Sequence, residues 1–277
     1  MTRTVLVAVD GTSPSEAAVE YGAETFPDSD LRLLHVVDPY GVGYDTDGRD
    51  PERLLADLAA VGEVDGKRPT TAIRVGRPAR EILAYAAETD VDEIVVGSHG
   101  REWGARVLLG SVAERVTRRA PVPVTIVRAG QRTGTRRLLV AIDGSPQSDA
   151  ALSYALSTFP DAEITVLHAI DPMETHFGEG QLAHTEDEYE RIRADAERLL
   201  AEARETAAER GVDVETVTAI EGRPNSPADA VLGYVDEADV DHVVVGSHGR
   251  SGATRVLLGS VAETIARRSP SPVTVVR

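Results

Sequence analysis

Two copies of one short loop carry the residues best suited to chemistry. The sequence Gly-Ser-His-Gly-Arg stands at residues 97–101 and again at residues 246–250, each time directly after an apolar run. The spacing from the first glycine is Gly-x2-Gly-x9-Gly-Ser in both copies, and it ends at residues 110–111 and 259–260. Glycine lets backbone N–H groups approach an anion closely. The spacing therefore predicts a phosphate-binding loop in each half of the chain.

The end of each loop adds further donors. Ser111 and Ser260 open segments with a helical pattern, and the first N–H groups and the dipole of a helix attract phosphate. Arg101 and Arg250 bring a cation to the same loops. The alternative is structural: the glycines only form tight turns and the two serines only cap helices. Neither a G-x-x-x-x-G-K-[ST] loop nor a G-x-G-x-x-G after a first strand is present, which argues against a Walker-type site and a dinucleotide oxidoreductase.

The chain is a tandem repeat. The segment RTVLVAVDGTSPSEAA at residues 3–18 corresponds to RRLLVAIDGSPQSDAA at residues 136–151, and VTIVR at 124–128 corresponds to the C-terminal VTVVR. Both halves run in the same order, so we expect duplication of a whole domain. The predicted boundaries are residues 1–128 for the first domain, 129–135 for a small polar linker and 136–277 for the second domain.

Each half alternates short β-branched runs with helical patterns. In the first half we expect strands at residues 4–9, 31–37, 70–75, 92–97 and 123–127, and helices at 13–25, 51–61, 78–89 and 111–119. The second half should follow the same order, with a longer second helix at 186–210. This alternation predicts an α/β fold with parallel strands covered on both faces. Such a sheet binds ligands at the carboxyl ends of its strands, where Asp10 and Asp143 end the first strand of each half.

Composition limits the function classes. The net charge is −17, cysteine is absent and Lys67 is the only lysine. The lack of cysteine excludes disulfides and thiolate chemistry. An acidic surface repels nucleic acid and is typical of a halophilic protein. The longest apolar runs fall far short of the roughly 18 residues of a membrane helix, and no signal peptide is visible. We expect a cytoplasmic protein that binds neither nucleic acid nor membrane.

The glycine loops, the Asp-Gly-Ser/Thr after each first strand and the Leu-His-Val type of second strand resemble those of the universal stress protein family. The resemblance covers both halves. It implies two tandem doubly wound domains, each a five-stranded parallel sheet of order 3-2-1-4-5 with helices on both faces. It also implies binding of ATP, accompanied by Mg²⁺, in members that keep the loop. The fifth strands pair between domains in this family, so the halves should form an internal pseudo-dimer; whether two chains pair further stays open.

The resemblance also transfers a nucleotide site to each half, residue by residue. It implies an acid near the adenosine, a small residue two positions earlier, a backbone contact to the adenine edge, a valine packed on the base, and the loop and helix start around ribose and phosphate. The first-half residues are Ala8, Asp10, Val36, Val96, Gly97, Gly100, Arg101, Gly110, Ser111 and Val112. The second-half residues are Ala141, Asp143, Ala169, Val245, Gly246, Gly249, Arg250, Gly259, Ser260 and Val261. Glu102-Trp103 replaces Ser251-Gly252 in the first half and makes that site the weaker one.

The motifs indicate binding rather than turnover. No nucleophile or general base is evident for attack on a γ-phosphate, no metal-ligand spacing stands out, and His35 and His168 lie inside apolar strands, where packing and hydrogen bonding are the expected roles. The leading hypothesis is an ATP-binding stress-response or signalling protein. A slow ATPase or autophosphorylating protein and a nucleotide-free scaffold stay open as alternatives. The sequence does not separate ATP from AMP or a cyclic nucleotide.

Overall fold

The computed structural model describes residues 2–39, 50–98, 109–170, 186–220, 226–249 and 258–277. In the first half the elements are β1 (Thr4–Val9), α1 (Ser13–Thr25), β2 (Asp30–Val37), α2 (Pro51–Val61), β3 (Thr70–Val75), α3 (Pro78–Glu88), β4 (Glu93–Gly97), α4 (Ser111–Thr117) and β5 (Val124–Val127). In the second half they are β6 (Arg137–Ala141), α5 (Pro146–Thr158), β7 (Glu163–Ile170), α6 (Glu186–Ala208), β8 (Val214–Ile220), α7 (Pro227–Glu237), β9 (His242–Gly246), α8 (Ser260–Arg268) and β10 (Val273–Val276).

Local sequence explains where many of the helices begin. Pro stands at the first or second position of α1, α2, α3, α5 and α7, where its fixed φ suits a helix and its missing N–H is not needed. Asp50, Ser145 and Ser226 accept backbone N–H groups at the starts of α2, α5 and α7. The expected elements are confirmed to within a residue or two at their ends, and α6 is the long helix of the second half.

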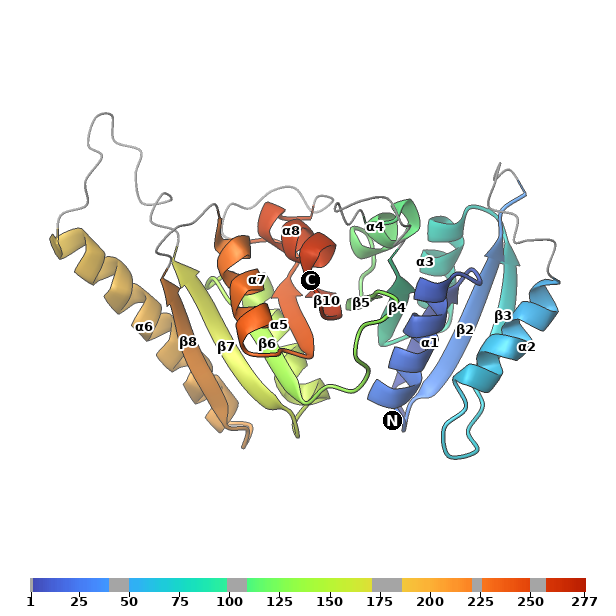
Figure 1. The fold of residues 1–277 in the computed structure, drawn as a ribbon, viewed down its shortest axis with the longest axis horizontal. Coiled ribbons are helices and arrows are strands. Elements are labelled where there is room, and N and C mark those ends of the chain that lie inside the picture. The colour runs from blue at the N-terminus through green and yellow to red at the C-terminus, as the bar shows by residue number, and fades with distance from the viewer. Residues whose placement is uncertain (1, 40–49, 99–108, 171–185, 221–225, 250–257) are drawn as a thin grey trace.

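The strands of both halves form one sheet, in the order β3-β2-β1-β4-β5-β10-β9-β6-β7-β8 among the described residues. Within each half all pairings are parallel and follow the predicted order 3-2-1-4-5. At the centre β5 and β10 pair antiparallel, with Thr125 opposite Thr274. The expected pairing of the fifth strands is thus confirmed, and Figure 1 shows the halves meeting at these two strands.

Two layers of helices bury the two faces of the sheet. One apolar cluster lies under α1, α2, α5 and α6, and the other lies under α3, α4, α7 and α8. Both clusters contain residues of both halves, so the core runs continuously across the seam. The central strands are almost wholly aliphatic, with Val5, Leu6 and Val7 inaccessible to solvent, as strands covered on both faces require.

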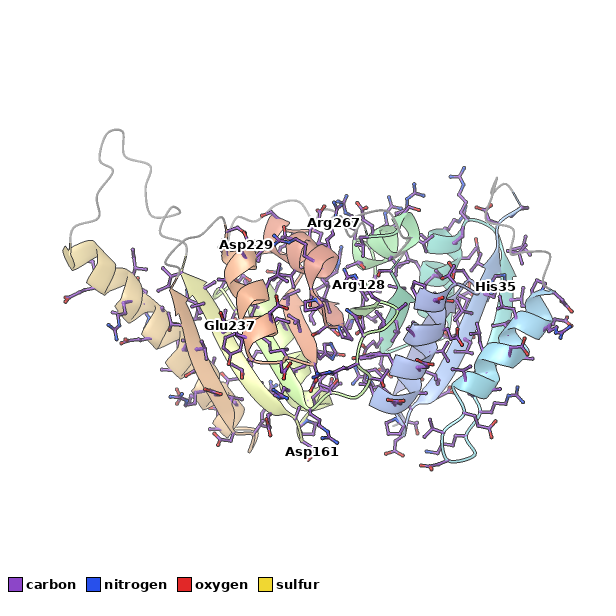
Figure 2. All side chains as sticks on the ribbon, in the orientation of Figure 1. His35, Arg128, Asp161, Asp229, Glu237 and Arg267 are labelled. Carbon is purple, nitrogen blue, oxygen red and sulfur yellow. The ribbon has the colours of Figure 1, made fainter. Side chains whose placement is uncertain are left out.

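Polar contacts reinforce the seam beyond the strand pairing. The Arg128 guanidinium donates to the carbonyl oxygens of Ser269 at 2.7 Å and Ala266 at 2.5 Å, at the end of α8 in the other half. Burial lowers the pKa of Arg128 to about 10, and the two carbonyls supply the negative end of a helix dipole to its charge. Figure 2 shows Arg128 and Arg267 near the middle of the molecule, where the halves meet.

Candidate functional site

Asp143 lies two residues beyond the end of β6, at the carboxyl ends of the second-half strands. Asp143 Oδ1 accepts the backbone N–H of Ser145 at 2.9 Å, which closes a tight turn through Gly144 at φ 78°. One strand away, His168 is 7% exposed, and its Nδ1 donates to the Ile142 carbonyl at 2.8 Å. His35 holds the Val9 carbonyl of the first half at 2.9 Å in the same way. The prediction that these histidines are packed, hydrogen-bonded residues is confirmed.

The first glycine of each loop is required by packing. A Cβ built on Gly246 would lie 2.7 Å from the Gln147 carbonyl carbon and 2.8 Å from the Ser148 nitrogen, in the first turn of α5. A Cβ on Gly97 would meet the Pro14 carbonyl carbon at 2.6 Å in α1. Both contacts are with backbone, which cannot rotate away as a side chain can. For these two glycines the structural alternative holds whether or not a ligand binds.

The other two glycines of the second loop face Asp143 and each other. A Cβ on Gly249 would lie 2.5 Å from Asp143 Oδ2, so the carboxylate rests against this part of the loop. The N–H of Gly259 donates to the Ser247 carbonyl at 2.8 Å and draws the start of α8 back to the end of β9. A Cβ on Gly259 would meet its nearest atoms, His248 Cα and Ser247 O, at 3.4 Å. Gly259 is therefore not demanded by packing.

The start of α8 lacks a side-chain cap. Gly259 is the N-cap residue, with φ −61° and ψ 148°, and no side chain caps the helix. Gly110 holds the same position before α4, again without a side-chain cap. The reading of Ser111 and Ser260 as helix caps is therefore wrong, because each occupies the first helical position instead. The first N–H groups of α8 are thus not taken up by a capping side chain, which is the arrangement that favours an anion.

Nine of the ten residues predicted for the second half line one pocket of about 160 Å³. They are Ala141, Asp143, Ala169, Val245, Gly246, Gly249, Gly259, Ser260 and Val261. Val245 is 3% exposed in its floor, whereas Val261 is 38% exposed on the first turn of α8. The structure thus brings together the ends of three strands, the loop and a helix N-terminus.

Several residues of the same pocket were not predicted from the sequence. Pro227 and Val231 of α7, Leu167 of β7 and Ala262 of α8 also line it, as does His248 of the glycine loop. Burial, and secondly the nearby Arg277 charge, lowers the pKa of His248, which favours the neutral ring. The sequence Gly-Arg-Pro, at residues 76–78 and again at 222–224, was the available signal for the third helix of each half, since it follows the third strand in both.

Within the described residues, the first half differs from the second at the acid. Asp10 Oδ1 accepts both the hydroxyl of Thr12 at 2.6 Å and its N–H at 3.1 Å. The corresponding Ser145 instead donates its hydroxyl to the His248 carbonyl at 3.2 Å. Val96 is buried at the end of β4, Ala8 and Val36 are half-buried at the adjacent strand ends, and Ser111 is exposed where α4 begins, as is Ser260 in α8. Gly110 and Val112 flank Ser111. Eight of the named loop residues lie outside the described part of the chain: His99, Gly100, Arg101, Glu102, Trp103, Arg250, Ser251 and Gly252.

Other candidate features do not coincide with this site. A larger hollow of about 490 Å³ lies at the opposite ends of β6, β7 and β8, lined by Arg137, Glu163 and Glu215 among others. It contains none of the glycine-loop residues. No group of three or more His, Asp or Glu side chains in the described ranges could hold a metal ion. Across those ranges, no helix combines the length and apolar character needed to cross a membrane.

Comparison with known proteins agrees with the geometry. A family model described as the universal stress protein family matches residues 1–128 and 134–277. A universal stress protein of Mycolicibacterium smegmatis is 32% identical over 298 residues, which cover 99% of this chain and 96% of the relative. One of Mycobacterium tuberculosis is 30% identical over 296 residues, with 99% and 96% covered.

A solved structure shares the fold across both halves. The crystal structure of a universal stress protein from Archaeoglobus fulgidus matches with a TM-score of 0.75 at 23% identity, covering 99% of this chain and 98% of that one. The family model and the relatives extend over both repeats, including both glycine loops. This chain therefore belongs to the universal stress protein family.

Proposed function

We propose that this protein binds ATP, accompanied by Mg²⁺, in the pocket of its second half and acts as a nucleotide-dependent stress-response or signalling protein. The observation that carries the proposal is the convergence on one pocket of Asp143, the glycine loop and the start of α8, which no side chain caps. The resemblance to family members that keep the loop points to the same ligand. Adenine nucleotide is thus the ligand class, and ATP is the member proposed.

Different residues of the pocket suit different parts of a nucleotide. The N–H groups that open α8, with the Ser260 hydroxyl, suit phosphate oxygens because they combine free donors with the positive end of the helix dipole. Asp143 accepts hydrogen bonds, which suits ribose hydroxyls rather than phosphate. Apolar Val245 and Val231 suit the face of a base. Among the described glycines of the second loop, Gly259 is the one whose added Cβ would meet no atom closer than 3.4 Å, so packing does not account for glycine at this position and contact with a phosphate would.

We propose an equivalent but weaker site in the first half. Asp10 has one carboxylate oxygen occupied by both donors of Thr12, whereas within the described residues Asp143 Oδ1 accepts only the Ser145 N–H. Satisfying Asp10 locally leaves less of its hydrogen-bonding capacity for a ligand. This difference lowers the affinity expected of the first-half site, as the presence of Glu102 and Trp103 in its loop also does.

Calorimetric titration of ATP with Mg²⁺ into the purified chain tests the proposal. Gly259→Ala should fold, since its Cβ meets nothing closer than 3.4 Å, and should weaken binding at least tenfold by intruding between the loop and the phosphates. Gly233→Ala in α7 is the matched control, because its Cβ meets no atom within 4 Å and the residue does not line the pocket.

The outcomes separate the candidate functions. Binding that is lost in Gly259→Ala and kept in Gly233→Ala supports nucleotide binding at α8. No binding of ATP, AMP or cyclic AMP by the parent protein would refute it and favour a scaffold. Mg²⁺-dependent phosphate release that is abolished in Asp143→Ala would instead identify a slow ATPase.

A further inference from the structure

A buried polar network crosses the seam between the halves, and the two halves contribute different residues to it. Glu93 opens β4 and His242 opens β9, so they occupy equivalent positions in the repeat. Both side chains are inaccessible to solvent. Between them lie Thr125 of β5 and Thr274 of β10, which are paired in the strand register. At the same repeat position, one half therefore presents an acid and the other an imidazole.

The hydrogen bonds of this network run in one direction. Thr125 donates its hydroxyl to Glu93 Oε1 at 2.6 Å, because a carboxylate only accepts. Having spent its proton, Thr125 must accept from the Thr274 hydroxyl, 2.5 Å away. Thr274 must in turn accept from His242 Nε2 at 2.8 Å. His242 thus carries its proton on Nε2, and its Nδ1 accepts from the Tyr21 hydroxyl at 2.9 Å.

Charge is balanced at the acid end only. The Arg3 guanidinium contacts Glu93 Oε2 at 2.7 Å, and the Tyr154 hydroxyl from the other half donates to the same oxygen at 2.8 Å. Burial raises the pKa of Glu93, opposed first by the Arg3 charge. At the other end burial lowers the pKa of His242 to about 3, so the ring is neutral. Each tyrosine reaches across the seam, Tyr21 to His242 and Tyr154 to Glu93.

The outer face of the seam is symmetric by contrast. Arg118 of α4 contacts Glu114 at 2.9 Å and Glu263 of α8 at 3.4 Å, and Arg267 contacts Glu263 at 2.8 Å and Glu114 at 3.9 Å. These four residues are two equivalent pairs of the repeat. The square they form would look the same if two copies of one half were paired. The buried network, in contrast, distinguishes the halves.

We propose that Glu93 and His242 make the seam specific for pairing one first half with one second half, and so reject a seam between two identical halves of separate chains. The partner that the β5 edge fits is therefore a surface bearing histidine, and the partner that the β10 edge fits is one bearing glutamate. This inference does not depend on the nucleotide proposal.

Two identical first halves cannot reproduce the network. With glutamate at both ends, each threonine hydroxyl would donate to its own carboxylate, and no proton would be left between two hydroxyl oxygens in contact. Two carboxylates would also be buried in one seam. Two second halves would bury histidine at both ends and contain neither this carboxylate nor Arg3, because Arg136 stands at that repeat position. In the full chain, Glu93→His would leave the Arg3 guanidinium, which is only 27% exposed, without its carboxylate. Removing one partner of a buried ion pair leaves an uncompensated buried charge.

Single substitutions in the full chain place the same residue type at both ends of the network. His242→Glu gives glutamate at both ends and Glu93→His gives histidine at both ends, whereas the double variant Glu93→His/His242→Glu restores one of each in exchanged positions. We expect each single change to raise the unfolding equilibrium constant roughly a hundredfold at pH 7, because Glu93→His breaks a buried ion pair and His242→Glu adds a second buried carboxylate. The double variant should recover at least tenfold relative to the product of the two single effects, measured by chemical unfolding.

Comparing glutamine with glutamate at position 242 separates the effect of charge from the effect of side-chain volume. Glutamine has the size of glutamate, so His242→Gln should lose less stability than His242→Glu at pH 7. The difference between them should shrink near pH 4.5, where an added carboxyl takes up a proton. The titratable and charged groups facing this site are Arg3 before β1, Tyr21 of α1, Glu93 of β4 and Tyr154 of α5. None of these groups is altered in that comparison.

Nitrogen NMR of the unaltered protein tests the directed network without any substitution. His242 should carry its proton on Nε2 and show no change of state from pH 7 to pH 5. A proton on Nδ1, or a titration near pH 6.5, would overturn the proposal. A double variant no more stable than the two single effects together predict would also overturn it. Failure of His242→Glu, Glu93→His and the double variant all to fold would do the same. Folding of the double variant where both single variants fail would support it.

Discussion

Two glycines of the second loop, Gly246 at the end of β9 and Gly259 before α8, should respond differently to the same added methyl group. At Gly246 the new Cβ would lie 2.7 to 2.8 Å from three backbone atoms of Gln147 and Ser148. At Gly259 the nearest atoms would lie 3.4 Å from the new Cβ, and the backbone φ of −61° suits alanine. We therefore predict that Gly246→Ala loses stability and that Gly259→Ala loses nucleotide affinity, although both glycines belong to one motif.

The loss of stability in Gly246→Ala can be worked out from the contacts of the added Cβ. Overpacking costs about 1 to 3 kcal/mol, and the upper end applies because backbone must move. Alanine recovers about 0.4 to 1 kcal/mol by restricting the unfolded chain. Gly246→Ala should thus lower the free energy of unfolding by about 2 kcal/mol, a fall of about 4 to 8 °C in Tm for a chain of this size. Gly259→Ala should cost less than about 1 kcal/mol, mainly because alanine is a poorer N-cap residue.

Thermal and chemical unfolding of both variants, beside Gly233→Ala, would measure these differences. Gly233→Ala should gain up to about 1 kcal/mol, since it removes a glycine from the interior of α7. ATP titration on the same samples would then compare affinities. Equal stability loss at Gly246 and Gly259, or a Gly246→Ala variant as stable as the parent protein, would refute the division between a packing glycine and a ligand glycine.

Three further predictions concern charge. Burial lowers the pKa of His242 from 6.5 to about 3, so below about pH 6.5 the unfolded chain binds a proton that the folded chain does not, and the contribution of His242 to stability should fall by about 1.4 kcal/mol per pH unit down to about pH 3. Urea unfolding at several pH values should therefore show a smaller loss of stability toward acid pH in His242→Gln. The raised pKa of Glu93 contributes the opposite slope in both proteins. Arg118→Ala should cost no more than about 1 kcal/mol, and less at high salt, because its ion pairs are partly exposed; a larger, salt-independent loss in unfolding experiments would contradict this. Asp143→Asn should weaken ATP binding in calorimetry with little change in Tm, and unchanged affinity would remove Asp143 from the site.

Local sequence was sufficient to predict the elements that position the site. The aliphatic runs at β1 and β4 could only be buried strands, and proline and Asp-Gly marked where α1 begins, because these signals act within a few residues. The repeat placed two acids and two glycine loops at the ends of parallel strands. The strand order and the pairing of β5 with β10 came from the resemblance to a family rather than from the residues.

Only the tertiary structure decided what the individual residues do. It showed that Gly246 is needed for contact with α5, about a hundred positions away, and that Gly259 rather than Ser260 is the N-cap residue. It also placed Glu93 and His242, which are 149 positions apart in sequence, at the two ends of one buried network. Sequence patterns report periodicity and local preference, whereas these roles depend on distances between segments that meet only when the sheet closes at its seam.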